Sequence, residues 1–230
     1  MSDPSSDRDA GLSWVQRNWL DQAKAWITAQ LDPLGASLTG EIEQPHVRWW
    51  STVLRVPTSA GTLYFKAVAP VWAFEPRLNA MLARVVPDCV PEIVAIDDER
   101  GWFLMRDAGT RLRELIKSNA DLYRWEELLP LYAELQIELA PHALELVALG
   151  VPDERLSVLP GHFRQLLDDR PEGLTAEEHE RLLESAPEVE ALCRELDSYG
   201  FPETIQHDDL HDGQIFVRDG RYLFFDWGDS

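Results

Sequence analysis

The fold and function predicted for this sequence depend on one polar stretch and on Asp226 further along the chain. The stretch is His207-Asp208-Asp209-Leu210-His211-Asp212-Gly213-Gln214. An apolar run, Ile215-Phe216-Val217, follows it, and Asp219-Gly220 is typical of a two-residue β-hairpin turn. A second apolar run, Tyr222-Leu223-Phe224-Phe225, then carries the chain back to Asp226. Because a hairpin returns the chain to the end where it began, we expect the polar loop and Asp226 to face one cleft.

The polar residues of this pattern have the chemistry of a kinase-type phosphoryl-transfer site. Asp209 would take a proton from an acceptor hydroxyl, while the side-chain oxygens of Gln214 and Asp226 would bind Mg²⁺. Magnesium prefers hard oxygen ligands of this kind. A solvated acidic β-hairpin is the alternative, but spacing, strand context and the second aspartate together favour a site.

Taken with Phe225-Asp226-Trp227-Gly228-Asp229, the stretch from His207 to Val217 resembles the aminoglycoside phosphotransferase family of small-molecule, protein-kinase-like kinases. The resemblance also takes in Lys66, Glu75 and Leu104-Met105-Arg106-Asp107. It therefore covers most of residues 35–230.

The resemblance implies an α+β, protein-kinase-like fold of two lobes. The N-terminal lobe would be a five-stranded antiparallel sheet with a helix, and the C-terminal lobe would be mainly helical with a catalytic β-hairpin. ATP and Mg²⁺ are the implied cofactors, and the γ-phosphate would move to a hydroxyl of an aminoglycoside-like molecule or another small polar metabolite. The implied roles are Asp209 as catalytic base, Gln214 and Asp226 as metal ligands, Lys66, Glu75, Met105 and Asp107 in nucleotide binding, and His207 and Asp229 as structural support.

Two positions depart from the family pattern. Gln214 stands where the family has asparagine, and Asp208 stands where it usually has glycine. Glutamine keeps the amide oxygen but lengthens the arm by one methylene, and a misplacement of about 1 Å costs roughly a hundredfold in rate. A non-catalytic, nucleotide-binding pseudokinase or interaction protein is therefore an open alternative, and a kinase acting on proteins is a third.

The order of elements predicts three segments. Residues 1–35 would hold a disordered tail over 1–12 and a helix, capped by Ser13, that packs on the next segment or, alternatively, binds a partner. Residues 36–107 would form the nucleotide-binding lobe and residues 108–230 the helical, catalytic lobe. Because family members continue into further helices, the resemblance implies that the chain is truncated at its C-terminus.

Within the nucleotide-binding lobe we expect strands over 37–43, 51–56, 62–68, 91–96 and 101–105, a glycine-free loop over 44–50, and a helix over 74–86. Lys66 lies in an apolar strand, so it either extends along an edge to water or points into a cleft at a counter-ion. The downstream motif favours the cleft. Glu75 would pair with Lys66 or serve as a carboxylate at the helix N-terminus.

Apolar residues at helical spacing predict the elements of the catalytic lobe. Pro130 should kink or split the helix over 121–139. Capping boxes at Thr175–Glu178 and Ser185–Glu188 should open two separate helices. The other expected helices span 112–116, 142–149 and 161–168.

The composition is that of a globular protein with an acidic bias. Hydrophobic residues make up 45% of the 230, and 41 acidic against 21 basic residues give a formal net charge of −20. Such a charge repels phosphate backbones, which argues against a nucleic-acid partner. It would attract a cationic small-molecule substrate, although plain solubility explains it equally well.

The two cysteines, Cys89 and Cys193, are far apart and form no metal-binding pattern. Reduced thiols in a cytoplasmic protein are the expected state. The polar N-terminus does not resemble a signal peptide, and no apolar run reaches the ~18 residues of a membrane span. We therefore expect no membrane partner, and the oligomeric state stays open.

Overall fold

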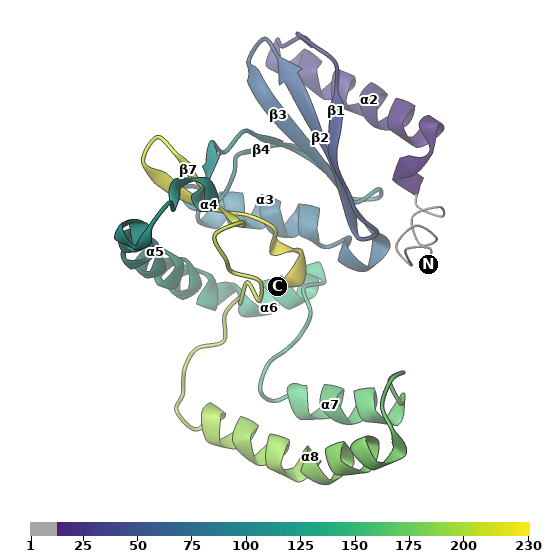
Figure 1. Cartoon of the computed structure of the whole chain (residues 1–230), viewed down its shortest axis with the longest axis vertical. Helices are drawn as coiled ribbons and strands as arrows, with labels where there is room; N and C mark the ends of the chain where they lie inside the picture. Colours follow the sequence, from purple (N-terminus) through teal and green to yellow (C-terminus); the bar gives the residue numbers. More distant parts are fainter. Residues whose placement is uncertain (1–12) are drawn as a thin grey trace. The chain divides into compact units, whose positions relative to one another are not determined.

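The computed structural model describes residues 13–230, so the tail expected over 1–12 lies outside the described residues. Contacts divide the chain into two compact units, Met1–Leu139 with Gln206–Ser230, and Ala140–Ile205 (Figure 1). The first unit carries both β-sheets and every candidate site residue. Each unit is described by itself below.

A five-stranded antiparallel sheet with the strand order β1-β2-β3-β5-β4 forms the centre of the first unit. It confirms the expected α+β class and the position of Lys66 on the third strand. The strands are β1 (Glu43–Val47), β2 (Ser51–Thr58), β3 (Gly61–Val68), β4 (Ile93–Asp97) and β5 (Trp102–Arg106).

The first strand was expected over 37–43, and this prediction is wrong. Strand β1 begins at Glu43 and takes up part of the loop expected over 44–50. Before it, Leu38 forms an isolated bridge with Thr58, and Thr39 N–H donates to Pro57 O (3.0 Å). Because Pro57 has no N–H to donate in return, the ladder cannot extend along this segment.

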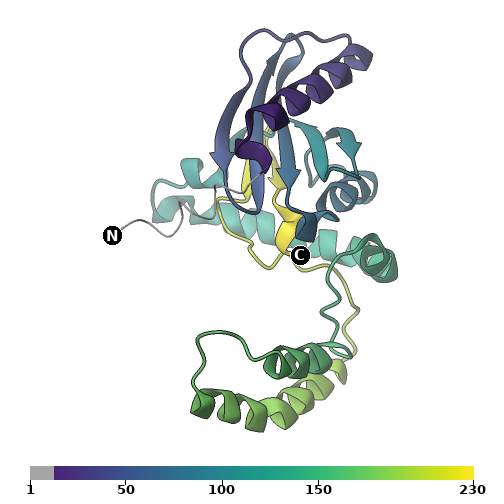
Figure 2. The same cartoon turned by 90° about the vertical axis from the view of Figure 1, so that its right-hand side faces the viewer.

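One face of the sheet is covered by helix α2 (Arg17–Leu31), which follows a 3₁₀ turn, η1 (Ser13–Val15), and ends in η2 (Asp32–Leu34) (Figure 2). Ser13 is not its cap, because the helix starts after Gln16. The shared core contains Trp14, Trp19, Ala23, Ile27 and Leu31 from the helical segment, and Leu54, Val56, Leu63, Phe65, Ala67, Trp102 and Leu104 from the sheet. The expected packing of this helix on the next segment is confirmed.

The opposite face of the sheet carries the site. Side chains alternate along a strand, so Lys66 points away from α2 while its neighbours Phe65 and Ala67 pack beneath that helix. Helix α3 (Glu75–Val85) follows the 3₁₀ turn η3 (Pro70–Trp72) and starts close to Lys66.

The stretch from His207 to Gln214 continues into the predicted hairpin, β7 (Ile215–Arg218) and β8 (Arg221–Phe224), with β6 (Thr110–Arg111) as a third strand. Arg218 pairs with Arg221 across the turn. Asp219 and Gly220 both have positive φ, 51° and 76°, as a two-residue type I′ turn requires. The short turn η6 (Trp227–Asp229) ends the unit.

The remaining helices of the first unit are α4 (Leu112–Leu115), the 3₁₀ turn η4 (Asn119–Leu122) and α5 (Tyr123–Leu139). Helix α5 continues through Pro130, so of the two expected outcomes, a kink or a split, the split does not occur. Proline removes one backbone donor, and the buried face with Leu128, Tyr132 and Leu135 continues on both sides of it.

The second unit is helical, with η5 (Ala140–His142), α6 (Ala143–Leu149), α7 (Leu159–Asp168) and α8 (Ala176–Asp197). Thr175 and Glu178 form the expected capping box. Ser185 does not open a second helix: its hydroxyl donates to Leu182 O (2.7 Å), and α8 runs on through Pro187. Over residues 13–230, no helix is long and apolar enough to cross a membrane.

The packing of α2 yields a stability prediction. Ile27 is fully buried against the sheet, so Ile27→Ala should lower the free energy of unfolding by about 2–5 kcal/mol in urea titrations. Exposed Gln22→Ala on the same helix is the matched control and should change it by less than about 0.5 kcal/mol. Equal effects of the two substitutions would mean that α2 is not part of the folded core.

Candidate active site

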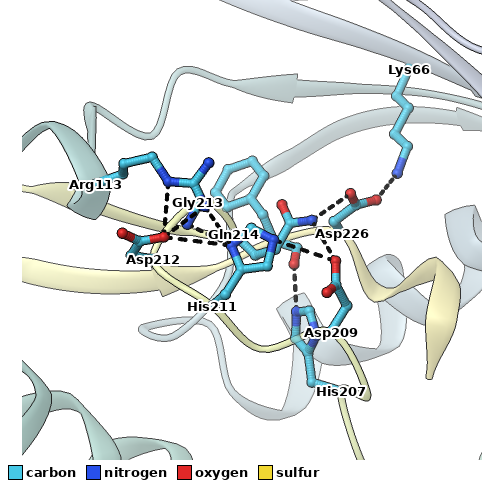
Figure 3. A network of polar contacts seen from close by, with 10 residues as sticks. Lys66, Arg113, His207, Asp209, His211, Asp212, Gly213, Gln214 and Asp226 are labelled. Carbon is cyan, nitrogen blue, oxygen red and sulfur yellow. Dashed lines mark hydrogen bonds and ion pairs between the residues drawn. The ribbon is translucent and has the colours of Figure 1, made fainter.

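A buried lysine between two carboxylates forms the centre of the site, and Figure 3 shows its contact with one of them, Asp226. Lys66 Nζ donates to Glu75 Oε1 at 2.6 Å and to Asp226 Oδ1 at 2.5 Å. Lys66 is 7% exposed and Glu75 2% exposed. Lysine therefore does not extend along a sheet edge to water, and Glu75 is both the first residue of α3 and an ion-pair partner.

Asp226 reaches this lysine from the far end of the hairpin. It follows β8 with φ 63° and ψ 56°, in the left-handed region. Aspartate tolerates this conformation better than most residues. The turn aims one carboxylate oxygen at Lys66 and leaves the other for Gln214.

Lys66, Glu75 and Asp226 form a trio of charged groups whose pKa values shift in different directions. Burial alone would lower the pKa of Lys66, but the charges of Glu75 and Asp226 outweigh it and raise that pKa. The charge of Lys66 lowers the pKa of Asp226. Burial raises the pKa of Glu75 to about 7, with Lys66 opposing and Asp226 adding to the rise. The trio holds one cation for two carboxylates, so Glu75 is the group that takes up a proton as the pH falls.

Gln214 lies between the two aspartates. Its Nε2 donates to Asp209 Oδ2 at 3.2 Å and to Asp226 Oδ2 at 3.0 Å (Figure 3). Both neighbours accept hydrogen bonds, so the amide nitrogen, rather than the oxygen, faces them. The structure thus brings Asp209, Gln214 and Asp226 together, but the amide oxygen expected to bind metal points elsewhere.

The loop from His207 to Gln214 begins with a three-residue turn. The Asp209 N–H donates to His207 O at 2.7 Å, and Asp208 at its centre has φ 58°. Glycine adopts this conformation freely, which gives a backbone reason for the glycine usual at this position. Aspartate accommodates the turn at some cost in strain.

His207, at the start of the loop, is buried and bonded to two residues outside the loop. It is 0% exposed, and its Nε2 donates to Phe225 O at 2.6 Å while its backbone N–H donates to Tyr132 Oη at 3.0 Å. Its ring packs on Trp227 with centroids 4.7 Å apart. Among the described residues, its Nδ1 has no hydrogen-bond partner. No pattern in the sequence predicted the contact of Tyr132 with His207.

Asp229 lies in η6, near the carboxylates of the site. Burial, followed by the charges of Asp226 and Asp209, raises its pKa. The negative charges of Asp209, Asp226 and Asp229 would together attract a cation to this part of the site.

Met105 and Asp107 lie at the end of β5, on a cleft of about 540 Å³. Met105 is a buried residue of β5, and Asp107 follows the last residue of that strand. The Asp107 N–H donates to Thr62 O at 3.2 Å, and its carbonyl accepts from Arg218 Nη1. Both backbone groups of Asp107 are thus engaged. Other residues lining this cleft are His46, Tyr64, Lys66, Phe103, Gln214 and Asp226.

Over residues 13–230, no three or more histidine, cysteine, aspartate and glutamate side chains form a metal-binding group. Two carboxylates and one amide nevertheless suit a hard divalent cation that keeps several waters. Asp226 and Gln214 would hold such a cation, the amide of Gln214 with its oxygen turned inward. These residues fit Mg²⁺.

Comparison with known proteins defines the class. The family model described as the phosphotransferase enzyme family matches residues 41–230. Because that is most of the chain, this protein belongs to the phosphotransferase enzyme family. A comparison with curated proteins gave no match.

Several solved structures share the fold at low sequence identity. A macrolide 2′-phosphotransferase type I is 13% identical with a TM-score of 0.55, covering 90% of this chain and 71% of its own. An ethanolamine kinase from Plasmodium vivax is 15% identical, with a TM-score of 0.55 and coverages of 87% and 57%. A choline/ethanolamine kinase family protein from Mesorhizobium loti is 17% identical, with a TM-score of 0.51 and coverages of 90% and 65%. The chain thus spans 57% to 71% of the lengths of these three proteins.

The raised pKa of Glu75 predicts a pH-dependent stability. Between the unfolded value of 4.5 and the folded value of about 7, the folded state binds more protons, so this residue makes stability fall as pH rises. The difference in unfolding free energy between the parent and Glu75→Gln should therefore fall by roughly 1–3 kcal/mol from pH 5 to pH 8.

Urea titrations across this pH range would measure the difference. Exposed Glu99→Gln is the matched control and should give a flat profile. A difference that rises with pH would instead mean that Lys66 stabilises the Glu75 carboxylate more than burial disfavours it.

Proposed function

We propose that this protein is an ATP- and Mg²⁺-dependent phosphotransferase that moves the γ-phosphate to a hydroxyl of a small polar molecule. The observation that carries the proposal is the continuous chain of contacts from Glu75 through Lys66, Asp226 and Gln214 to Asp209. It joins residues up to 160 positions apart. A solvated acidic hairpin would have no need of a buried lysine from the other sheet.

Each residue then has a role that its position supports. Lys66, held by Glu75, would bind the nucleotide phosphates, and Asp226 and Gln214 would hold Mg²⁺, which neutralises developing charge when bound. Met105 and Asp107 line the cleft where the base of the nucleotide would bind. His207 and Asp229 would hold the loop and the end of the hairpin in place.

Asp209 is suited to act as the base. Its Oδ2 accepts from Gln214, while among the described residues none donates to Oδ1. That oxygen is therefore open to accept the proton of an acceptor hydroxyl. In phosphoryl transfer the base mainly orients the nucleophile, so a carboxylate fixed at one oxygen is the appropriate arrangement.

For the acceptor, we propose a cationic small molecule. The net charge of −20 favours accumulation of cations at the surface. Among structures of the same fold are a macrolide phosphotransferase and kinases named for choline and ethanolamine. A cytoplasmic location and the absence of a nucleic-acid partner stay predictions from the sequence.

A non-catalytic nucleotide-binding protein is the second candidate, favoured by the hydrogen bonds that Gln214 makes to both aspartates. A shorter asparagine would not span both oxygens so easily. If glutamine holds the two carboxylates together, it competes with the cation that the reaction needs.

Substitution of the two aspartates tests the main proposal. Asp209→Ala should lower turnover by about 10²–10⁴-fold and leave Mg·ATP binding intact, because Asp209 faces the acceptor. Asp226→Ala should weaken Mg²⁺-dependent nucleotide binding itself, because it removes a charged ligand. The measurements are ADP release with an aminoglycoside, a macrolide, choline and ethanolamine, beside calorimetric Mg·ATP binding.

Exposed Asp197→Ala, on α8, is the matched carboxylate control and should behave like the parent. Turnover by Asp209→Ala at the parental rate would rule out its role as base. Nucleotide binding by Asp226→Ala that keeps its full dependence on Mg²⁺ would rule out the assigned metal ligand.

Gln214→Asn separates the two candidates. Shortening the arm should release the bridge between the aspartates and raise phosphotransfer by about tenfold to a hundredfold. A lower rate would show that glutamine is an adapted ligand and would remove the main support for the non-catalytic candidate. If parent and variant both bind Mg·ATP and neither releases ADP with any acceptor, the non-catalytic candidate is favoured.

A further inference from the structure

His211 lies between the candidate base and an ion pair on its other side (Figure 3). Its Nε2 is 3.5 Å from Asp209 Oδ2. On the opposite edge of the ring, Nδ1 faces Gly213 N–H at 2.8 Å and Arg113 Nη2 at 3.3 Å. The sequence motif contained His211, but its spacing assigned the residue no role.

These contacts favour one tautomer of the ring. A backbone N–H and a guanidinium are donors without acceptor capacity, so Nδ1 has its lone pair toward them, while the nearest acceptor, Asp212 Oδ1, lies farther from Nδ1, at 3.7 Å. A neutral ring then has its proton on Nε2, directed at Asp209. A separation of 3.5 Å exceeds a normal hydrogen bond, but such contacts in a site without substrate commonly shorten when the substrate binds.

Arg113 fixes the ring from the side of helix α4. Its Nε and Nη2 donate to Asp212 Oδ1 at 2.9 and 2.7 Å, and its backbone N–H donates to Asp212 O at 3.0 Å. Side chain and backbone of one residue thus hold the loop that carries His211. Exposed ion pairs stabilise the fold little, so the geometric effect on the loop is the more important consequence.

Gly213 provides a second, independent observation. A Cβ on this residue would lie 2.5 Å from His211 Cε1, 2.9 Å from Nδ1 and 3.1 Å from Arg113 Nη2. Its φ is not in the left-handed region, so a side chain here would meet these two side chains rather than strain the backbone. The close approach lets its N–H reach the ring, and a Cβ would displace the ring or the guanidinium.

Gln214 and His211 face the same oxygen of Asp209. Gln214 Nε2 donates to Oδ2 at 3.2 Å, and His211 Nε2 lies 3.5 Å from it. Once the His211 contact shortens, the carboxylate is held at one oxygen from two directions, and its other oxygen then points to one place. Small errors in such orientation are costly in phosphoryl transfer, where alignment supplies much of the catalysis.

We propose that His211 is a positioning residue that orients Asp209 through an Nε2–H tautomer set by Arg113 and Gly213. This inference rests on the proposed function, because it assigns Asp209 the role of base. It assigns His211 no contact with the nucleotide, so its loss should reduce the rate of the chemical step and leave nucleotide binding unchanged.

Three substitutions at this edge of the loop test the proposal kinetically. His211→Ala should lower kcat by roughly tenfold to a hundredfold, with the KM for ATP changed less than about twofold. His211→Gln, whose amide nitrogen can reach the Nε2 position, should recover part of that loss. Gly213→Ala should mimic His211→Ala because it displaces the ring while keeping every polar group. His162→Ala, on α7, is the control and should match the parent.

The tautomer gives a readout that needs no turnover. Long-range ¹H–¹⁵N spectra of histidine-labelled protein should show His211 with an unprotonated Nδ1 and a protonated Nε2, and this preference should be lost in Gly213→Ala. An Nδ1–H tautomer in the parent would overturn the proposal.

The outcomes separate this proposal from the function on which it rests. If the parent transfers phosphate and the His211 and Gly213 substitutions leave kcat unchanged, the positioning role alone fails. If the parent transfers phosphate to none of the four acceptors, the proposed function fails, and the positioning role fails with it even where the tautomer is as expected.

Discussion

The ion pair network of Lys66 is the interaction on which the rest of the site depends. Removing charged groups from water costs several kcal/mol each, and only close counter-charges offset that cost. Lys66 has two, and they come from the start of α3 and the end of the hairpin. Sheet, helix and hairpin must therefore be placed together for the lysine to be buried at all, since losing either carboxylate leaves charge in the interior without full compensation.

Gln214 lies beside the oxygen of Asp226 that Lys66 does not bind. Lys66 binds Oδ1 of Asp226, so Oδ2 and the carboxylate of Asp209 face each other across the amide. With acceptors on both sides, the N–H groups of Gln214 must face inward. If Gln214 is to help hold a cation together with Asp226, its amide would have to present the oxygen instead of the nitrogen.

The sequence predicted those features whose signals are local. Asp219-Gly220 defines the hairpin because few other residues adopt positive φ twice in succession, and the hairpin by itself places Asp226 beside the loop. Prediction was wrong where a local signal competes with another interaction. Pro57, distant in sequence, prevents residues 37–42 from extending the sheet, and Ser185 donates to the preceding helical turn rather than capping a new helix. The supporting roles of Tyr132 and Arg113 depend on contacts 75 and 99 residues away, which no short pattern encodes.

Two aspartates of the site, Asp208 and Asp226, have left-handed backbones, with φ of 58° and 63°. Such conformations cost roughly 1–2 kcal/mol in residues other than glycine, so the surroundings must hold them in place. For Asp226 the compensation is visible, because its carboxylate binds both Lys66 and Gln214. Glycine would relieve the strain but would remove the charge that balances the lysine. The strain at Asp226 thus follows from the requirement for a carboxylate at a point that the chain reaches only by turning sharply out of β8.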